Sequence, residues 1–509
     1  MQGYNKGFLY FICAVSAMGG LLFGYDWVVI GGAKPFYELF FSISDSPVMQ
    51  GVAMTTALIG CLAGAMVAGA AADRYGRKPL LTVSAVLFTV SAIGTGLFND
   101  FTLFNIARFV GGVGIGVASA LAPMYIAEVS PAGIRGRMVS LNQMTIVLGI
   151  LGAQIVNMLL ARDTSVAAEQ AWNVAWGWRW MFWAETVPAA LFLAMSFFIP
   201  ESPVFLSLRA AAKARQANGA GTQGRQAAAD GGLRTADGGL RTADGRLRTA
   251  DSGLRAAADG GQGTATVTQC TGRQGTADGG LRTADGRQGT ADGGRQGTAG
   301  LRELFEGRYR RVLVLGLVIA VFQQWCGTNV IFNYAQEIFV GAGFDVDGMF
   351  INIVITGIAN VVFTVVALYT IEKWGRRTLI LLGAGGLGLT YLTLGSCYYF
   401  GVKGFVMVAL VVLAISTYAM TLAPVTWTLL AEIFPNRIRG VAMATCTFAL
   451  WVGCCTLTFS FPSMNAALGS SGSFWVYSVI CFCAFVYLWR RCPETKGKSL
   501  LQLESELIG

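Results

Sequence analysis

Apolar runs of about 20 residues, separated by short polar segments, recur along most of the chain. A helix needs roughly 20 apolar residues to cross the hydrocarbon core of a bilayer. The pattern therefore predicts an all-α membrane protein with twelve transmembrane helices, embedded in a lipid bilayer. The expected helices span residues 8–30, 50–72, 79–98, 102–127, 138–161, 178–199, 311–340, 349–371, 378–400, 405–431, 441–465 and 473–490.

Composition supports this interpretation. Of the 509 residues, 54% are hydrophobic and only 13% are charged, whereas ordinary soluble domains carry about 25% charged residues. Soluble enzymes, secreted disulfide scaffolds and nucleic-acid-binding modules are therefore disfavoured. The net charge of +9 does not indicate a nucleic-acid partner, because residues 209–300 alone contribute 13 Lys or Arg and 8 Asp, a net of +5. The other basic residues form short clusters between apolar runs.

These clusters are unevenly distributed between the two ends of the predicted helices. The loops after odd-numbered runs carry few basic residues, namely Lys34, Arg162 and Lys403. An excess of Lys and Arg marks the cytoplasmic side of a membrane protein, so we expect both basic termini to be cytoplasmic. The loops after even-numbered runs carry Arg74, Arg77, Lys78, Arg135, Arg137, Arg376, Arg377, Arg437 and Arg439.

Metal, cofactor and enzymatic sites find no support in the sequence. The chain has no His, and eight of its 11 Cys lie inside apolar runs, where they are most simply small hydrophobic residues. No nucleophile motif or phosphate-binding loop is present. We therefore expect neither a metal nor a cofactor, and no enzyme activity. The eight are Cys13, Cys61, Cys326, Cys446, Cys454, Cys455, Cys481 and Cys483.

Three motifs recur about 300 residues apart. Residues 73–78 (DRYGRK) match 372–377 (EKWGRR), 127–137 match 431–440, and 200–202 (PES) match 493–495 (PET). A repeat at a constant offset indicates two parallel six-helix halves. We expect an N-terminal half at 1–200, a cytoplasmic loop at 201–308, a C-terminal half at 309–491 and a cytoplasmic tail at 492–509.

The loop contains a low-complexity insert at residues 209–300. The unit GLRTADG occurs at 232–238, 239–245 and 280–286. Each unit offers one Leu and at least one Gly, so no continuous apolar seam for a coiled coil results. We expect a mostly disordered cytoplasmic insert without a binding role.

Three charged residues interrupt the apolar runs of the N-terminal half. Asp26 lies in the first run, and a carboxylate at membrane depth is costly unless it is paired or protonated. We expect it to carry protons, although it could instead only stabilise helix packing. Arg108, which precedes Gly112 and Gly116 in a helix suited to close packing, is its expected partner. Glu185 could be a second relay carboxylate or an anchor for a cytoplasmic Arg.

The C-terminal half instead carries uncharged polar groups. Gln323, Gln324 and Asn329 surround Gly327, which allows the helix to bend. Such amides, together with flat Trp faces, suit a neutral polyhydroxylated ligand, whereas any single amide could simply join helices. Further amides and rings of this kind are Gln143, Asn360, Trp427 and Trp451.

In the order and spacing of its motifs, the chain resembles the sugar porters of the major facilitator superfamily, most closely the bacterial xylose:proton symporters. The resemblance covers the chain outside the insert. Its motifs are Gly24-Tyr25-Asp26, residues 73–78, 123–128 leading to Arg135-Gly136, 200–203, Gln323-Gln324 with Asn329, 375–377, 431–435 and 493–497.

The resemblance implies import of a neutral monosaccharide, a pentose or hexose, with protons through the bacterial inner membrane. We expect a monomer whose proton-coupling residues are Asp26, Arg108 and Glu185. A passive facilitator and a non-transporting sugar sensor are the alternatives. The implied sugar contacts are Phe23, Gln143, Gln323, Gln324, Asn329, Asn360, Trp427 and Trp451. The implied cytoplasmic gate consists of Asp73, Arg74, Arg77, Glu128, Arg135, Glu201, Glu372, Arg376, Arg377, Glu432, Arg437 and Arg439.

Three positions depart from the family pattern. Leu450 stands where relatives often have Gln or Asn, so one hydroxyl partner is absent. Asn333 replaces an aromatic residue of the outer gate, and Val204 follows Pro203 where relatives usually have Arg. These departures bear on which sugar is bound and on the energetics of the gates.

Overall fold

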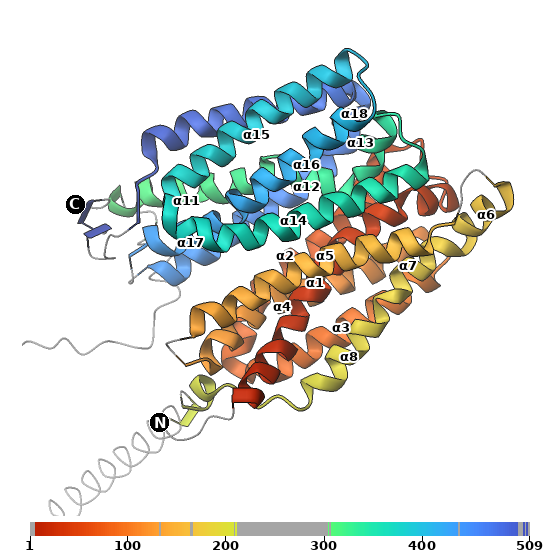
Figure 1. The fold of residues 1–509 in the computed structure, drawn as a ribbon. Helices are drawn as coiled ribbons and strands as arrows, with labels where there is room; N and C mark the ends of the chain where they lie inside the picture. Colours follow the sequence, from red (N-terminus) through yellow and green to blue (C-terminus); the bar gives the residue numbers. More distant parts are fainter. Residues whose placement is uncertain are drawn as a thin grey trace, which may run out of the picture. The chain divides into compact units, whose positions relative to one another are not determined.

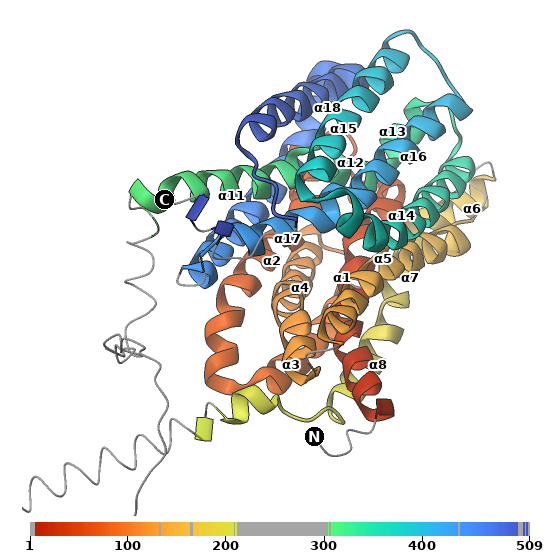
Figure 2. The ribbon, with the colours of Figure 1, turned by 60° about the vertical axis from the view of Figure 1, so that its left-hand side comes forward.

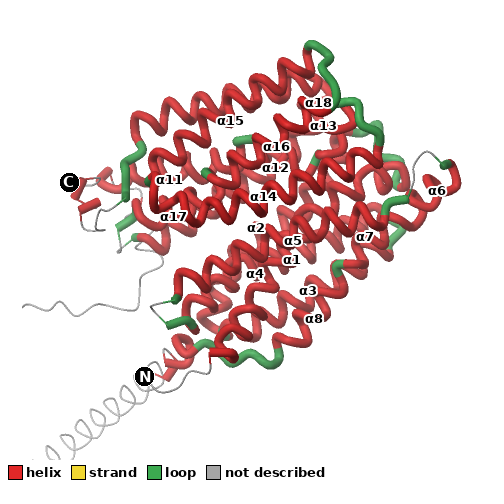
Figure 3. Tube along the Cα trace, in the orientation of Figure 1, coloured by secondary structure: helices red, strands yellow, loops and turns green. Residues whose placement is uncertain are grey.

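The computed structural model describes residues 6–131, 134–162, 166–207, 209–210, 304, 307–435, 438–496, 502–503 and 505–506. Apart from its first two residues, the predicted insert lies outside this part of the chain. All regular structure in the described residues is helical (Figure 3).

The N-terminal half consists of helices α1 to α8. Polar caps set two of its helix starts: Ser46 accepts a hydrogen bond from the Met49 amide before α2, and Asp100 accepts from the Thr102 amide before α4. The elements are α1 (Lys6–Phe40), α2 (Pro47–Tyr75), α3 (Arg77–Leu97), α4 (Phe101–Val129), α5 (Arg135–Leu160), α6 (Ala167–Trp172), the π-helical turn η1 (Asn173–Gly177), α7 (Trp178–Ala184) and α8 (Thr186–Ser196).

The C-terminal half consists of helices α11 to α18. Gly327 has a left-handed φ of 86° and separates α11 from α12, which confirms the predicted break in that run. The elements are α11 (Gly307–Trp325), α12 (Thr328–Asn333), α13 (Ala335–Gly341), α14 (Val346–Trp374), α15 (Arg376–Tyr399), α16 (Phe405–Met420), α17 (Leu422–Ile433) and α18 (Arg439–Arg491).

Ten helical segments of the described residues are long and apolar enough to cross a membrane. One of them, within α18, contains two helices that meet at Gly469, where φ is 69° and ψ is 175°. The segment from α6 to α8 adds a further apolar passage that η1 and Glu185 divide into short helices. The described structure thus accounts for the twelve predicted runs.

The prediction for the end of the first helix was wrong. The apolar run was expected to end at residue 30 and to leave Lys34 in a loop, but α1 continues through Lys34 and Pro35 to Phe40. Lys34 is tolerated inside the helix because Glu38, one turn later, neutralises its charge, with 2.9 Å between Nζ and Oε1. The pattern of apolar residues alone does not show that a charged residue can be neutralised by a neighbour on the same helix.

Small residues allow the helices of the N-terminal half to approach closely. A Cβ on Gly112 or Gly116 of α4 would overlap the carbonyl oxygen of Ala57 or Cys61 in α2, which confirms the predicted close packing of α4. Across the halves, α2 packs on α18 and α5 packs on α14. The red-to-yellow helices form one bundle and the green-to-blue helices form the other (Figures 1 and 2).

Candidate functional site

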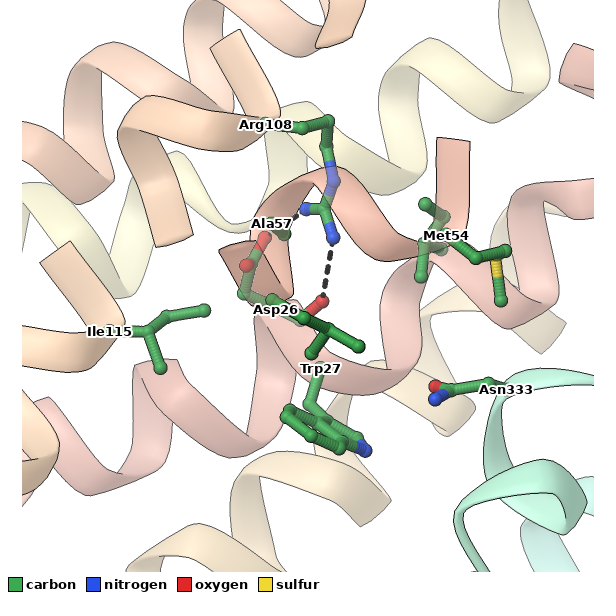
Figure 4. A pocket seen from close by; sticks show the side chains of 9 residues that line it. Asp26, Trp27, Met54, Ala57, Arg108, Ile115 and Asn333 are labelled. Atoms are coloured by element: carbon green, nitrogen blue, oxygen red, sulfur yellow. Dashed lines mark hydrogen bonds and ion pairs between the residues drawn. The ribbon is translucent and has the colours of Figure 1, made fainter. Parts of the chain in front are cut away.

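An ion pair lies in the middle of the N-terminal half. Asp26 of α1 and Arg108 of α4 are each 2% exposed, and an Arg108 Nη1 hydrogen donates to Asp26 Oδ1 (Figure 4). Arg108 Nη2 also lies 3.4 Å from the Asp26 carbonyl oxygen, and its guanidinium carbon lies 5.4 Å from the centroid of the Phe182 ring. The pairing predicted for these two residues is therefore present in the structure.

Glu185 belongs to the same buried cluster. It lies between α7 and α8, is 2% exposed, and interacts electrostatically with both Asp26 and Arg108. The other oxygen of Asp26, Oδ2, has no hydrogen-bond donor among the described residues. Two buried carboxyl groups beside one guanidinium leave one negative charge unbalanced, so the Asp26 and Glu185 pair offers a place for a proton.

A small pocket borders this cluster. Its volume is about 10 Å³, close to the minimum space for one water molecule. Trp27 lines it from α1 and Asn333 lines it from the C-terminal half, whereas Met54 contributes from α2 (Figure 4). A pocket of this size admits no sugar, so in this conformation it is a space beside the ion pair only.

The amides predicted in the C-terminal half form a chain of hydrogen bonds. Asn329 Nδ2 donates to Gln324 Oε1, Gln324 Nε2 donates to Gln323 Oε1 over 2.7 Å, and Gln323 Nε2 donates to the Tyr418 hydroxyl over 2.6 Å. Asn329 Nδ2 also lies 3.7 Å from Cys454 Sγ. Each amide keeps further donor or acceptor capacity, so the chain presents several uncharged polar groups of fixed orientation.

Aromatic rings from both halves meet near this region. Phe23 and Trp27 of α1 lie 6.2 Å and 6.0 Å, centroid to centroid, from Trp451 of α18. Trp27 also contacts Phe23 edge-on at 5.6 Å. The predicted wall residues Phe23 and Trp451 are thus brought together, with Trp27 as a third member that the sequence did not single out.

The remaining predicted sugar contacts, Gln143, Asn360 and Trp427, are not members of the hydrogen-bonded amide chain. Asn360 is buried in α14, and Gln143 is half-buried in α5. Trp427 of α17 is 40% exposed. The structure assigns none of these three a hydrogen bond to Gln323, Gln324 or Asn329.

The loop between α2 and α3 is held by an Arg and two Glu residues. Arg77 Nη2 lies 3.1 Å from Glu128 Oε1 and 3.3 Å from Asp73 Oδ1. Glu201 Oε1 accepts hydrogen bonds from the backbone amides of Arg77 and Lys78, at 2.9 Å and 3.2 Å. These orphan amides at the start of α3 are thereby satisfied.

The C-terminal half repeats this arrangement between α14 and α15. Arg376 Nη2 lies 3.2 Å from Glu432 Oε1, and Glu494 accepts from the backbone amides of Arg376 and Arg377 at 3.1 Å and 3.2 Å. Gly76 and Gly375 occupy matching turns with φ of 104° and 85°. The repeat read from the sequence therefore has a counterpart in geometry.

In this conformation the loop ion pairs Arg77 with Glu128 and Arg376 with Glu432 each join residues of one half. Of the other predicted gate residues, Arg74 lies over the Tyr75 ring at 5.3 Å, and Arg377 Nη2 donates to the Trp489 carbonyl over 2.8 Å. The side chains of Arg135, Glu372, Arg437 and Arg439 lie outside the described structure.

Sequence reasoning missed two polar partners. Glu494 could have been assigned from the repeat, since it matches Glu201 within PES and PET. Tyr418 carried no such signal, because a single Tyr in an apolar run is indistinguishable from a packing residue.

The family model described as "Sugar (and other) transporter" matches residues 12–274 and 276–507. The chain belongs to the sugar porter family. Because it belongs to a family of transporters, the protein is a sugar transporter and not an enzyme.

Two curated relatives match this sugar transporter over nearly its whole length. It is 33% identical to a D-xylose-proton symporter of Escherichia coli strain K12, over 99% of this chain and 96% of that protein. It is 31% identical to an arabinose-proton symporter of Bacillus subtilis, over 99% and 96%.

A solved structure supports the fold. The sugar transporter is similar to the xylose transporter of E. coli in an inward open conformation, with a TM-score of 0.72 and 30% identity over 98% of this chain and 100% of that one. This similarity confirms the predicted all-α fold of the major facilitator superfamily. It also confirms the prediction that the chain is a multi-pass membrane protein.

Proposed function

We propose that this sugar transporter imports a neutral monosaccharide, a pentose or hexose, together with a proton. It does so as a monomer in a bacterial inner membrane, by alternating access between its two halves. The end of the bundle that carries Arg77 and Arg376, called here the basic end, faces the cytoplasm under the positive-inside rule. The relatives named above are proton symporters of xylose and arabinose, which supports both the substrate class and the coupling.

The observation that carries the proposed coupling is the buried cluster of Asp26, Arg108 and Glu185. Two carboxyl groups face one guanidinium, so the cluster has one negative charge more than it can neutralise. In a medium that solvates charge poorly, a proton on one carboxyl balances that excess. Binding and release of this proton would change the partners of Arg108 and so couple protons to the position of α1 against α4.

The sugar is proposed to bind to the uncharged amide chain. Gln323, Gln324 and Asn329 offer donors and acceptors without a net charge, and the Phe23, Trp27 and Trp451 rings offer apolar faces. A neutral polyhydroxylated molecule needs this combination. We include Gln143, Asn360 and Trp427 as contacts that join when the halves change position.

The charged loops at the basic end are proposed to form the inner gate. Arg77 with Glu128, and Arg376 with Glu432, pair within their own halves here. Closing the inner gate would let some of these charges, together with those of Arg135, Glu372, Arg437 and Arg439, pair across the halves. The similarity to an inward open structure agrees with a conformation in which that gate is open.

Asp26→Asn tests the coupling. Asparagine preserves the shape of the side chain but fixes its neutral form, while Glu185 remains as the second carboxyl group of the cluster. We expect loss of uphill accumulation and of sugar-induced alkalinisation of the medium, with retained counterflow. Labelled xylose, arabinose and glucose in proteoliposomes are the probes, and Asp45→Asn in the loop after α1 is the matched control.

The outcomes separate the alternatives. If Asp26→Asn still concentrates sugar and still takes up protons with it, the assignment to Asp26 is wrong and Glu185→Gln is tested next. A facilitator would equilibrate sugar without responding to a proton gradient, in the wild type as in the variant. A sensor would show no counterflow at all.

A further inference from the structure

Lys34 is a buried cation at the end of the bundle opposite the basic end. It is 1% exposed, and its Nζ contacts two carboxylates, Glu38 on its own helix and Glu337 on α13 of the other half. Its Nζ also lies 5.3 Å from the centroid of the Tyr334 ring. An ammonium group with so little solvent is stabilised only by such partners.

The position follows from the path of the chain. Helix α1 starts at the basic end, and α2 returns to that end at Tyr75, so Lys34 and Glu38 lie near the opposite turn. A cavity of about 250 Å³ adjoins the three charges there. It is lined from both halves, with Gln50 of α2 and Asn465 of α18 on its wall.

Apolar contacts continue the same seam. The rings of Phe36 in α1 and Phe350 in α14 stack at 6.4 Å, centroid to centroid. Earlier on α1, a Cβ on Gly31 would meet the carbonyl oxygens of Phe332 and Asn333 in the other half at 2.9 Å and 3.1 Å. The ion pair of Lys34 with Glu337 is therefore the charged part of a closed seam between the halves.

We propose that Lys34 is the latch of the outer gate. Its ion pair with Glu337 holds the gate closed, and its ion pair with Glu38 keeps the ammonium group neutralised when the gate opens. The proposal rests on alternating access as put forward above. In the closed gate Lys34 binds both carboxylates. When the halves separate, Glu337 leaves with α13 into the widening cavity, where water solvates it, while Glu38 remains one helical turn from Lys34 and keeps the ammonium paired.

This division of roles predicts opposite effects for two similar substitutions. Glu337→Gln weakens only the closed gate, because Lys34 keeps Glu38 in both states. Glu38→Gln weakens mainly the open gate, because Lys34 then loses its one remaining partner on opening. If both carboxylates instead stabilised only the closed gate, the two substitutions would shift the gate in the same direction.

Hydrogen–deuterium exchange of the full-length protein in lipid nanodiscs measures the balance between the open and the closed outer gate. It requires no knowledge of the sugar. For Glu337→Gln we expect faster uptake in peptides from the end of α1 and from α12 and α13, on the order of tenfold, since exchange follows the open population. Peptides from α5 and α17 at the basic end should become more protected. Glu38→Gln should change both sets in the opposite sense.

Glu169→Gln is the matched control, because Glu169 pairs with Arg162 at 3.2 Å at the same end but within one half. It should leave both sets of peptides unchanged. Unchanged or slower exchange of the α1, α12 and α13 peptides in Glu337→Gln would overturn the latch. Should Glu38→Gln fail to fold, Glu38→Asp replaces it, because the shorter side chain lengthens and so weakens the contact with Lys34. Because the readout needs neither sugar nor proton gradient, the latch can fail while proton symport stands, and the reverse.

Discussion

The two halves share their loops but differ at their centres. In both, a Gly with positive φ joins two helices, and the Arg that starts the second helix pairs with a Glu at the end of the following membrane passage. A second Glu caps the start of that second helix. At membrane depth the N-terminal half instead carries Asp26, Arg108 and Glu185, whereas the C-terminal half carries amides. The two halves thus have the same loop motifs, which hold neighbouring helices together. They differ in the buried polar residues to which we assign proton coupling and sugar binding.

This difference separates two kinds of energetic cost. A buried charge without its partner is far more expensive than a buried amide without one. Under the proposed function, proton coupling depends on the first kind of group and sugar binding on the second. Substitutions in the two halves should therefore differ in size and in the property they change.

The largest effect is expected from Arg108→Leu. Removing the guanidinium leaves Asp26 and Glu185 without a cation, which should lower the free energy of unfolding by roughly 3–5 kcal/mol. The thermal unfolding midpoint in detergent is the measurement. Adding Asp26→Leu to Arg108→Leu removes one of the two carboxyl groups that lost their cation, so the double variant should melt closer to the wild type. Equal midpoints for the single and double variants would show that the pair does not govern stability.

A smaller effect, on binding rather than stability, is expected from Gln324→Ala. Its loss removes the hydrogen-bond partner of Gln323 Oε1 and the acceptor at Gln324 Oε1 for Asn329 Nδ2, together with a proposed contact to the sugar. The expected cost is about 1–3 kcal/mol, or roughly ten- to hundred-fold in affinity. Isothermal titration with xylose, arabinose and glucose measures it. Gln170→Ala in α6 is the matched control. Wild-type affinity in well-folded Gln324→Ala would exclude this amide from the sugar site.

The smallest effect is expected from Tyr418→Phe. The hydroxyl that accepts from Gln323 Nε2 is lost, so the amide chain is less fixed in orientation. We expect about 0.5–1.5 kcal/mol of weaker sugar binding, a few-fold in affinity, with normal proton coupling. Tyr398→Phe, which removes a bond to the Ile338 carbonyl, controls for loss of a hydroxyl from the same half. An equal loss in both variants would assign Tyr418 a packing role.

Much of the fold is written in the sequence. Apolar runs of bilayer length predict the helices, because each backbone polar group in lipid must bond within its own helix. Gly327, Gly76 and Gly375 mark the breaks, since positive φ is readily adopted only by glycine. The pairing of Asp26 with Arg108 could also be predicted, because two buried opposite charges in one half have few other partners.

Only the tertiary structure decided which distant residues meet. Lys34 looked like one of the few basic loop residues, yet Glu38 and Glu337, the latter 303 positions away, hold it inside a helix. Tyr418 joins the amide chain because the fold brings its hydroxyl, near the end of α16, within hydrogen-bonding distance of Gln323 in α11. A sequence pattern shows only the energetic cost of burying each residue by itself. The contacts that offset this cost come from residues distant in sequence, which only the packing of the helices brings close.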